Sequence, residues 1–152
     1  MDIHNLIYAF LITLIPAIEL RGGILYGIGV GENPFLVFLV CTIANILLIF
    51  PTFFFLSYIF PFFEHLPIIQ PLLESTRRKT HPYVEKYGFI GLAIFVAVPL
   101  PGTGAYTGAL GAYLLGMKKR KAIPAIAIGV VIAGIVVTLA AIGFFGAIFS
   151  VM

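Results

Sequence analysis

The chain has 152 residues, of which 61% are hydrophobic and only 10% are charged. Soluble domains are about one quarter charged, so this composition excludes an ordinary soluble protein and predicts an integral membrane protein. The net charge of +3 does not indicate a nucleic-acid partner, because eight of the nine basic residues lie in two short stretches between apolar runs, at residues 77–86 and 118–121.

Four uncharged runs make up the apolar part of the chain, residues 3–18, 33–63, 87–117 and 122–152. A spanning helix needs about 20 apolar residues, so the last three runs are each long enough to cross a bilayer. The lone cysteine, Cys41, excludes an internal disulfide and a cysteine metal motif, and we expect it to pack between helices. The sequence therefore predicts an all-α, polytopic membrane protein.

The first segment, residues 3–31, is too long for one span and too short for two. Residues 24–31 would rise only about 12 Å as a helix, against a hydrocarbon core of about 30 Å. We therefore expect a re-entrant hairpin whose tip contains Pro16 and the sequence ELRGG at residues 19–23. Non-helical backbone is tolerated at membrane depth only where protein or water covers it, so this tip must face inward. A span over residues 34–63 follows.

The same pattern returns in residues 87–117, where the sequence PLPGTG at residues 99–104 interrupts an apolar run. Pro99 and Pro101 cannot continue a straight helix, so we expect a second re-entrant hairpin here. A span over residues 122–151 follows it. Full-length kinked spans are the alternative to both hairpins.

Residues 1–63 and 87–152 thus form two expected repeats of hairpin and span, joined by an amphipathic connector, residues 64–86, at the membrane interface. If each hairpin returns to the side from which it entered, the connector and the basic loop 118–121 share one side. The positive-inside rule makes that side cytoplasmic and both termini extracytoplasmic. The two repeats are then inverted, as in many secondary transporters, in the inner or plasma membrane.

Small residues recur every four positions after each tip. The two sets are Gly23, Gly27 and Gly31, and Gly104, Gly108, Ala112 and Gly116. Such stripes let helices approach closely. On the first span, Asn45 is expected to form a hydrogen bond between helices rather than to bind a ligand.

Glu19 and Arg21 place two charges in the first tip. Each is costly at membrane depth, about 2.5 to 3.5 kcal/mol for a charged residue at a helix centre. Residues two apart do not face each other on a helix, so a local ion pair requires an extended tip. Otherwise Arg21 reaches the second tip, where carbonyls and the hydroxyls of Thr103, Tyr106 and Thr107 are available.

The outbound arm of each hairpin begins at a tip, where its first backbone amides are free and the positive end of the helix dipole lies. Glycines let an anion approach such amides, so two helix ends and one guanidinium predict a site for a phosphate or carboxylate. The expected substrate-binding residues are Arg21, Gly22, Gly23, Gly102, Thr103, Gly104, Tyr106 and Thr107. Glu19 is the expected proton-coupling group, because a carboxylate removed from water takes up a proton more readily.

The motifs PAIELRGG at residues 16–23 and VAVPLPGTGAYTG at residues 96–108 resemble the putative small multidrug export protein family of bacteria and archaea, a distant branch of the DedA (VTT-domain) superfamily. The resemblance covers nearly the whole chain. It implies two facing re-entrant hairpins and proton-linked transport, which for DedA relatives moves polyprenyl phosphate lipid carriers. DedA proteins have an arginine beside a Pro-Gly pair in the second hairpin. Pro101 and Gly102 match that pair without an arginine, and Arg21 can supply the cation instead.

The sequence therefore favours a small transporter or flippase, coupled to protons, for an anionic amphipathic substrate such as a polyprenyl phosphate. We expect it to act as a homodimer among membrane lipids, without a cofactor. The alternatives are export of lipophilic cations bound by Glu19, and a scaffold in which Glu19 and Arg21 are only a structural lock. An enzyme is not expected, because the apolar segments contain no nucleophile with a base, metal cluster or paired acids.

Overall fold

The computed structural model describes residues 2–16, 18–63, 65–100 and 102–151. Every regular element in these ranges is a helix, which confirms the expected all-helical class. The elements are α1 (Ile3–Thr13), α2 (Glu19–Gly29), α3 (Pro34–Tyr58), the short 3-10 helix η1 (Phe60–Phe62), α4 (Gln70–Ala97), α5 (Ala105–Leu114) and α6 (Lys119–Val151).

Two helices in the described ranges, Pro34–Tyr58 and Lys119–Ala147, are long and apolar enough to cross a membrane. Their outer faces expose large apolar side chains at helical spacing. On α3 these are Ile43, Leu47, Phe50 and Phe54, and on α6 they are Ile128, Ile132, Ile135, Leu139 and Ile142. Exposing such continuous apolar faces to water is unfavourable, whereas contact with lipid carries no such cost. The chain is therefore a membrane protein, as its composition predicts.

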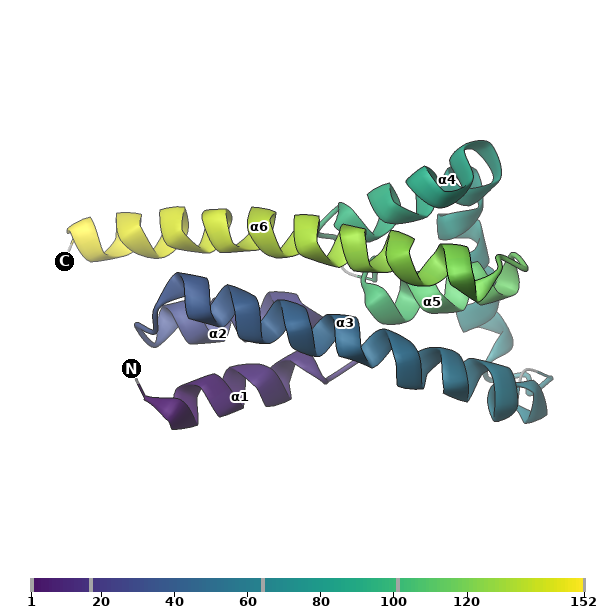
Figure 1. Ribbon diagram of the computed structural model, residues 1–152, viewed down its shortest axis with the longest axis horizontal. Coiled ribbons are helices and arrows are strands. Elements are labelled where there is room, and N and C mark those ends of the chain that lie inside the picture. The colour runs from purple at the N-terminus through teal and green to yellow at the C-terminus, as the bar shows by residue number, and fades with distance from the viewer. Residues whose placement is uncertain (1, 17, 64, 101, 152) are drawn as a thin grey trace.

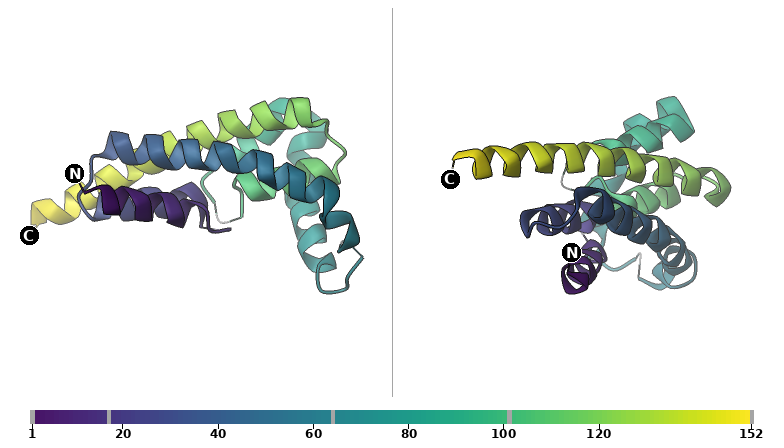
Figure 2. Two further views of the ribbon diagram at one scale, coloured as in Figure 1. Left: turned by 60° about the horizontal axis from the view of Figure 1, so that its bottom comes forward. Right: turned by 60° about the vertical axis from the view of Figure 1, so that its left-hand side comes forward.

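The long helices α3 and α6 run side by side in opposite directions along the molecule (Figure 1). Helices α1 and α2 also run in opposite directions and lie in the half of the molecule that contains the two chain termini (Figure 1). The described residues between them, 14–16 and 18, are called the first junction and lie near the middle of the molecule. The described residues between α4 and α5, 98–100 and 102–104, are called the second junction and also lie near the middle. From there, the end of α4 and the whole of α5 extend toward the opposite end of the molecule (Figures 1 and 2). The two junctions therefore approach each other from opposite ends.

The expected tip sequence ELRGG is helical, which corrects one sequence-based expectation. Helix α2 begins at Glu19, so residues 19–23 form its first turn, and the chain reverses direction before them. Pro16 lies in this first junction and is exposed. The reversal needs only the short segment between Thr13 and Glu19.

Helix α4 is broken at Gly88, whose φ of 53° and ψ of −118° are not helical. The break separates a segment over residues 70–87 from a second segment over residues 89–97, close to the expected boundary between connector and hairpin. The first segment crosses the direction of the long helices (Figure 2). It packs on α5, where Thr80 is buried next to Gly111.

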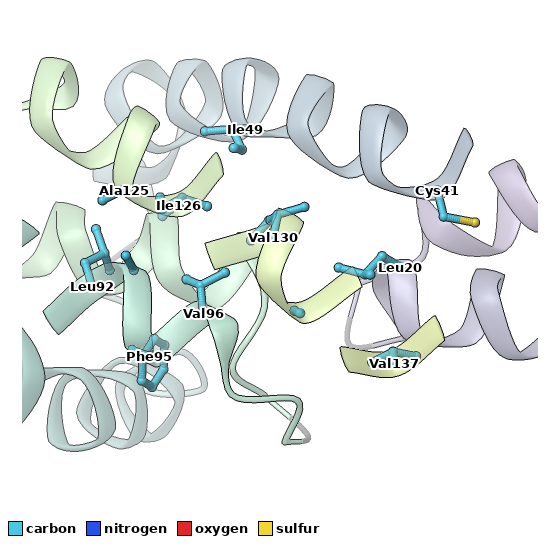
Figure 3. Packing of buried hydrophobic residues seen from close by; sticks show 14 of the residues in the cluster. Leu20, Cys41, Ile49, Leu92, Phe95, Val96, Ala125, Ile126, Val130 and Val137 are labelled. Carbon is cyan, nitrogen blue, oxygen red and sulfur yellow. The ribbon is translucent and has the colours of Figure 1, made fainter. Parts of the chain in front are cut away.

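The core follows α6, which contacts most of the other helices (Figure 3). Ala125 and Ile126 lie near Leu92 at one end, and Val130 lies between α3 and Val96. Val137 continues the same buried face toward Leu20 at the other end. This continuous apolar core fixes both junctions against one rigid helix.

The glycine stripes serve two purposes rather than one. Gly27 lies against Val37 and Gly108 lies against Val96, so these positions give the close helix contacts that the sequence predicts. Gly31 and Gly116 instead have φ values of 88° and 67°, and a Cβ at either position would meet no atom within 4 Å. They end α2 and α5 in the same hydrogen-bonded turn, in which the residue after each glycine donates to a carbonyl five positions earlier.

Glu32 ties the amino terminus to the loop after α2. Its Oε1 accepts the backbone N–H of Asp2 at 2.7 Å and the side-chain N–H of Asn5 at 3.1 Å. The hydrogen bond from Asp2, followed by that from Asn5, holds the pKa of Glu32 below its ordinary value of 4.5.

We expect Glu32→Gln to lower the melting temperature of the purified protein at neutral pH. A carboxyl group with a lowered pKa stabilises the fold above its unfolded pKa, and this contribution is lost as the pH falls through the folded pKa. The difference between wild type and variant should therefore shrink below pH 4.5, the ordinary value of the group. Circular dichroism melts over a pH series measure it, and a difference that stays constant down to low pH would contradict the assignment.

Candidate functional site

Arg21 joins the two junctions directly. Its Nη2 donates to the backbone oxygen of Thr103 at 3.0 Å, to Thr103 Oγ1 at 3.0 Å and to the backbone oxygen of Val98 at 3.3 Å. The guanidinium is half-buried, so these acceptors replace much of the water that it loses. One charged side chain of α2 thus holds the second junction in place.

Thr103 organises the second junction from within. Its hydroxyl lies within hydrogen-bond distance of the backbone oxygens of Val98 and Leu100, and it accepts the N–H of Leu100 at 3.2 Å. A single buried side chain therefore closes this segment on itself and presents its carbonyls to Arg21. Pro99 is exposed in the same segment, and Pro101 lies outside the described residues.

Glu19 makes the second connection, at the amino terminus of α5. Its Oε2 accepts the N–H of Ala105 at 3.0 Å and its Oε1 accepts the N–H of Tyr106 at 3.2 Å. The N-cap residue, Gly104, has no side chain that could accept these bonds. A carboxylate from another helix therefore caps α5 and lies at the positive end of its dipole.

The backbone at Glu19 is unusual. Its φ is +53°, the only positive φ at a non-glycine residue in the described ranges. Such a conformation costs on the order of 1–3 kcal/mol and persists where the surroundings fix it. Here the side chain is only 2% exposed and both carboxylate oxygens are hydrogen-bonded, so the tertiary contact with α5 holds the strained residue.

Glu19 and Arg21 do not form an ion pair with each other within 4.0 Å in the described part of the chain. Each binds a different part of the second junction instead. Of the two arrangements that the sequence left open, the structure has the one in which Arg21 reaches across. A third connection joins the same elements, because the Tyr106 hydroxyl donates to the backbone oxygen of Leu14 at 2.9 Å.

The other expected binding residues divide into two groups. Gly22 packs on Ile18, and Gly23 packs between α1 and α3, against Ala9 and Cys41, so both lie in helix contacts away from the second junction. Gly102, Thr103, Gly104 and Tyr106 come together around Glu19 and Arg21, and Thr107 lies half-buried one residue further along α5.

A further cation lies close to the second junction. The nearest atom to the position of a Cβ on Gly102 is Nζ of Lys79, at 3.4 Å. Lys79 belongs to the first segment of α4, and the sequence placed it in the connector without a role at the site. Because the angle of that segment is set by packing on α5, no local sequence signal indicates this approach.

A groove of about 370 Å³ runs beside the two junctions. It is lined by Pro16, Leu48, Pro51, Thr52, Phe55 and Tyr106. One wall is α3, and the other contains one residue from the first junction and one from α5. An apolar groove of this kind at a cluster of polar groups is a common form of ligand site.

Asn45 differs from its expected role. Its side chain is 0% exposed, and neither Oδ1 nor Nδ2 has a hydrogen-bond partner in the described ranges. The expected interhelical hydrogen bond is therefore not formed. A buried amide without a partner inside a membrane helix is the kind of signal that marks a functional position.

The model of the family described as "Putative small multi-drug export protein" matches residues 19–136. The matched range starts at Glu19 and contains the second junction, α5 and most of α6. No match was found among curated proteins or among solved structures.

Proposed function

The chain belongs to the putative small multi-drug export protein family, and from this we propose that it is a proton-coupled transporter of an anionic amphipathic substrate. A lipid phosphate such as a polyprenyl phosphate carrier is the substrate class that the site favours. The family description is consistent with a membrane transporter rather than an enzyme. The relationship to the DedA superfamily and the homodimer stay predictions.

The proposed architecture is an inverted repeat of two re-entrant hairpins. Three features support it. The two junctions reach the middle of the molecule from opposite ends (Figure 1). Gly31 and Gly116 end the outbound helices in the same turn. Each of these glycines also precedes the first residue of the next long helix by three positions, Pro34 in one half and Lys119 in the other. In this arrangement both termini are extracytoplasmic and the basic connector faces the cytoplasm.

The observation that carries the proposal is the carboxylate of Glu19 on the first amides of α5. This contact indicates that the end of α5 accepts an anion, and that the chain supplies one itself. Protonation of Glu19 removes the charge that those amides and the helix dipole stabilise. A phosphate can then replace the carboxyl group at the same amides, so proton binding and substrate binding favour each other at one place.

The surroundings complete a site for an amphipathic anion. Arg21 and Lys79 lie on the second junction and supply positive charge for a phosphate. The groove that Tyr106 helps to line is largely apolar and suits a hydrocarbon tail. A lipid could therefore place its head group at the junctions while its tail stays among apolar side chains.

Arg21→Ala is the direct test of this site. We expect at least a tenfold loss of lipid phosphate transport in proteoliposomes, because both the cation and its hold on the second junction are removed. Arg120→Ala, which removes an exposed basic residue at the start of α6, should transport normally. Normal transport by Arg21→Ala, with insertion and reconstitution equal to wild type, would refute the role of Arg21.

Export of lipophilic cations is the second candidate, favoured by the family description. In that case deprotonated Glu19 binds the cation and Arg21 has only a structural role. Uptake of a lipid phosphate analogue and of a lipophilic cation, measured in the same proteoliposomes, separates the two candidates. Transport of the cation alone, driven by an imposed pH gradient, would replace the first proposal with the second.

A further inference from the structure

Three buried side chains of the long helices have no hydrogen-bond partner for their polar atoms in the described ranges. They are Thr42 and Asn45 on α3 and Thr138 on α6, with exposed fractions of 5%, 0% and 9%. Four other buried or half-buried hydroxyls of the bundle behave differently, because each donates to the carbonyl one turn earlier on its own helix. These are Thr13, Thr52, Ser57 and Thr80.

The unpartnered side chains follow one another along the direction of the long helices. Thr42 Oγ1 lies 2.9 Å from the position of a Cβ on Gly134, so it faces α6. Thr138 is one turn beyond Gly134 on α6, and Asn45 is nearly one turn beyond Thr42 on α3. Because α3 and α6 run in opposite directions, the order along the two helices, read from the end of the molecule with both termini toward its middle, is Thr138, then Thr42, then Asn45.

The inner end of this series lies at the level of Glu19. Helices α2 and α3 run in opposite directions, and Gly27 lies against Val37 while Gly23 lies against Cys41. One further turn on each helix places residue 19 opposite residue 45. The titratable groups that interact with Glu19 are Arg21 on its own helix and Tyr106 on α5. Asn45 is not titratable, so it adds only a neutral polar side chain at the level of this site.

The outer end of the series opens into a groove of about 450 Å³ between α3 and α6. Thr138 lines it together with Asn33 at the start of α3 and with apolar residues, of which Ile135, Leu139 and Ile142 also belong to the lipid-facing side of α6. The polar side chains between the groove and Glu19 are about one helical turn apart, near 5.4 Å of rise. This is too far for direct hydrogen bonds, but a water molecule can bridge such a gap when polar groups lie on both sides.

We propose that Thr138, Thr42 and Asn45 hold a file of ordered water molecules that carries protons between this groove and Glu19. The delivery of protons to Glu19 for transport rests on the proposed function. The presence of water between these side chains does not, because it is independent of which substrate is carried. Because the groove includes Asn33 at the start of α3, the file leads from Glu19 toward the end of the molecule where both termini lie, without opening the junctions. The three side chains position water and do not themselves exchange protons.

Hydration is tested first, on the full chain in lipid bilayers. In water-edited solid-state NMR of threonine-labelled protein, magnetisation from water should reach the methyl groups of Thr42 and Thr138 several-fold faster than those of Thr13 and Thr80. The two controls are also buried threonines, both 0% exposed, but their hydroxyls are bonded within their own helices. Equal build-up rates at all four threonines would overturn the proposal, whether or not the protein transports a lipid phosphate.

Proton delivery is tested with the isosteric variant Thr42→Val. We expect at least a threefold slower response to an imposed pH gradient, while the melting temperature stays at or above that of wild type because an unpartnered hydroxyl is removed from the core. Thr13→Val serves as the control and should respond at the wild-type rate. A lowered melting temperature with an unchanged proton response would show that the Thr42 hydroxyl is structural and would overturn its place in the file.

Discussion

Gly104→Ala is expected to break the contact between the two junctions and to abolish transport. A Cβ at residue 104 would overlap the carboxylate of Glu19, which lies in the core and cannot move aside without leaving the amides of Ala105 and Tyr106 unpaired. A buried donor without a partner costs about 1–3 kcal/mol, so the two together should lower the melting temperature by several degrees. Cys41 is buried and free, so its reaction with a thiol-reactive dye reports unfolding.

The matched control is the same substitution where there is space. Gly143 and Gly146 lie in α6, whereas Gly104 is the residue just before α5, and a Cβ at Gly143 or Gly146 meets no atom within 4 Å. Gly143→Ala and Gly146→Ala should melt at or slightly above the wild-type temperature, because alanine favours a helix over glycine by about 1 kcal/mol. If Gly104→Ala melts and transports like these controls, the carboxylate of Glu19 is not held at the end of α5.

Much of the fold was predictable because membrane helices obey simple limits of length and polarity. Uncharged runs of sufficient length predicted α3 and α6, and Pro99 predicted the second junction, because proline ends a helix that lacks a compensating partner. The boundary expected after residue 86 falls close to Gly88, where α4 is broken. These features depend on neighbours in the sequence, so they can be read locally.

The polar contacts of the site were only partly predictable. The rule that a free helix end attracts an anion drew attention to the start of α5, but it gave no means to see that the carboxylate of Glu19, distant in the sequence, lies at those amides. The approach of Lys79 to Gly102 depends on the angle at which α4 crosses the bundle. Long-range geometry of this kind leaves no periodic signal in a single sequence.

Gly31 and Gly116 illustrate the opposite case, in which the signal was present but was assigned to packing. Each is the last member of a stripe of small residues spaced four positions apart. Each is also followed within two positions by a charged residue, as expected where a helix ends. Asn45 was recognised from the sequence as a polar residue on the first span and was expected to form a hydrogen bond between helices. Composition alone could not show that its side chain lacks a hydrogen-bond partner in the described ranges, because this depends on how the helices pack around it.

Glu19→Gln is expected to uncouple transport from protons. Glutamine stays neutral at every pH, so it cannot exchange a charge with the substrate at the amides of α5, and transport with and without an imposed pH gradient should become equal. The remaining amide oxygen can still accept one of the two N–H groups, so the loss of stability should be smaller than for Glu19→Ala, which leaves both donors unpaired. Glu74→Gln, on the exposed side of α4, should keep the wild-type response to the gradient. Accumulation of substrate against its gradient by Glu19→Gln, at the wild-type level and driven by protons alone, would assign the coupling to another group.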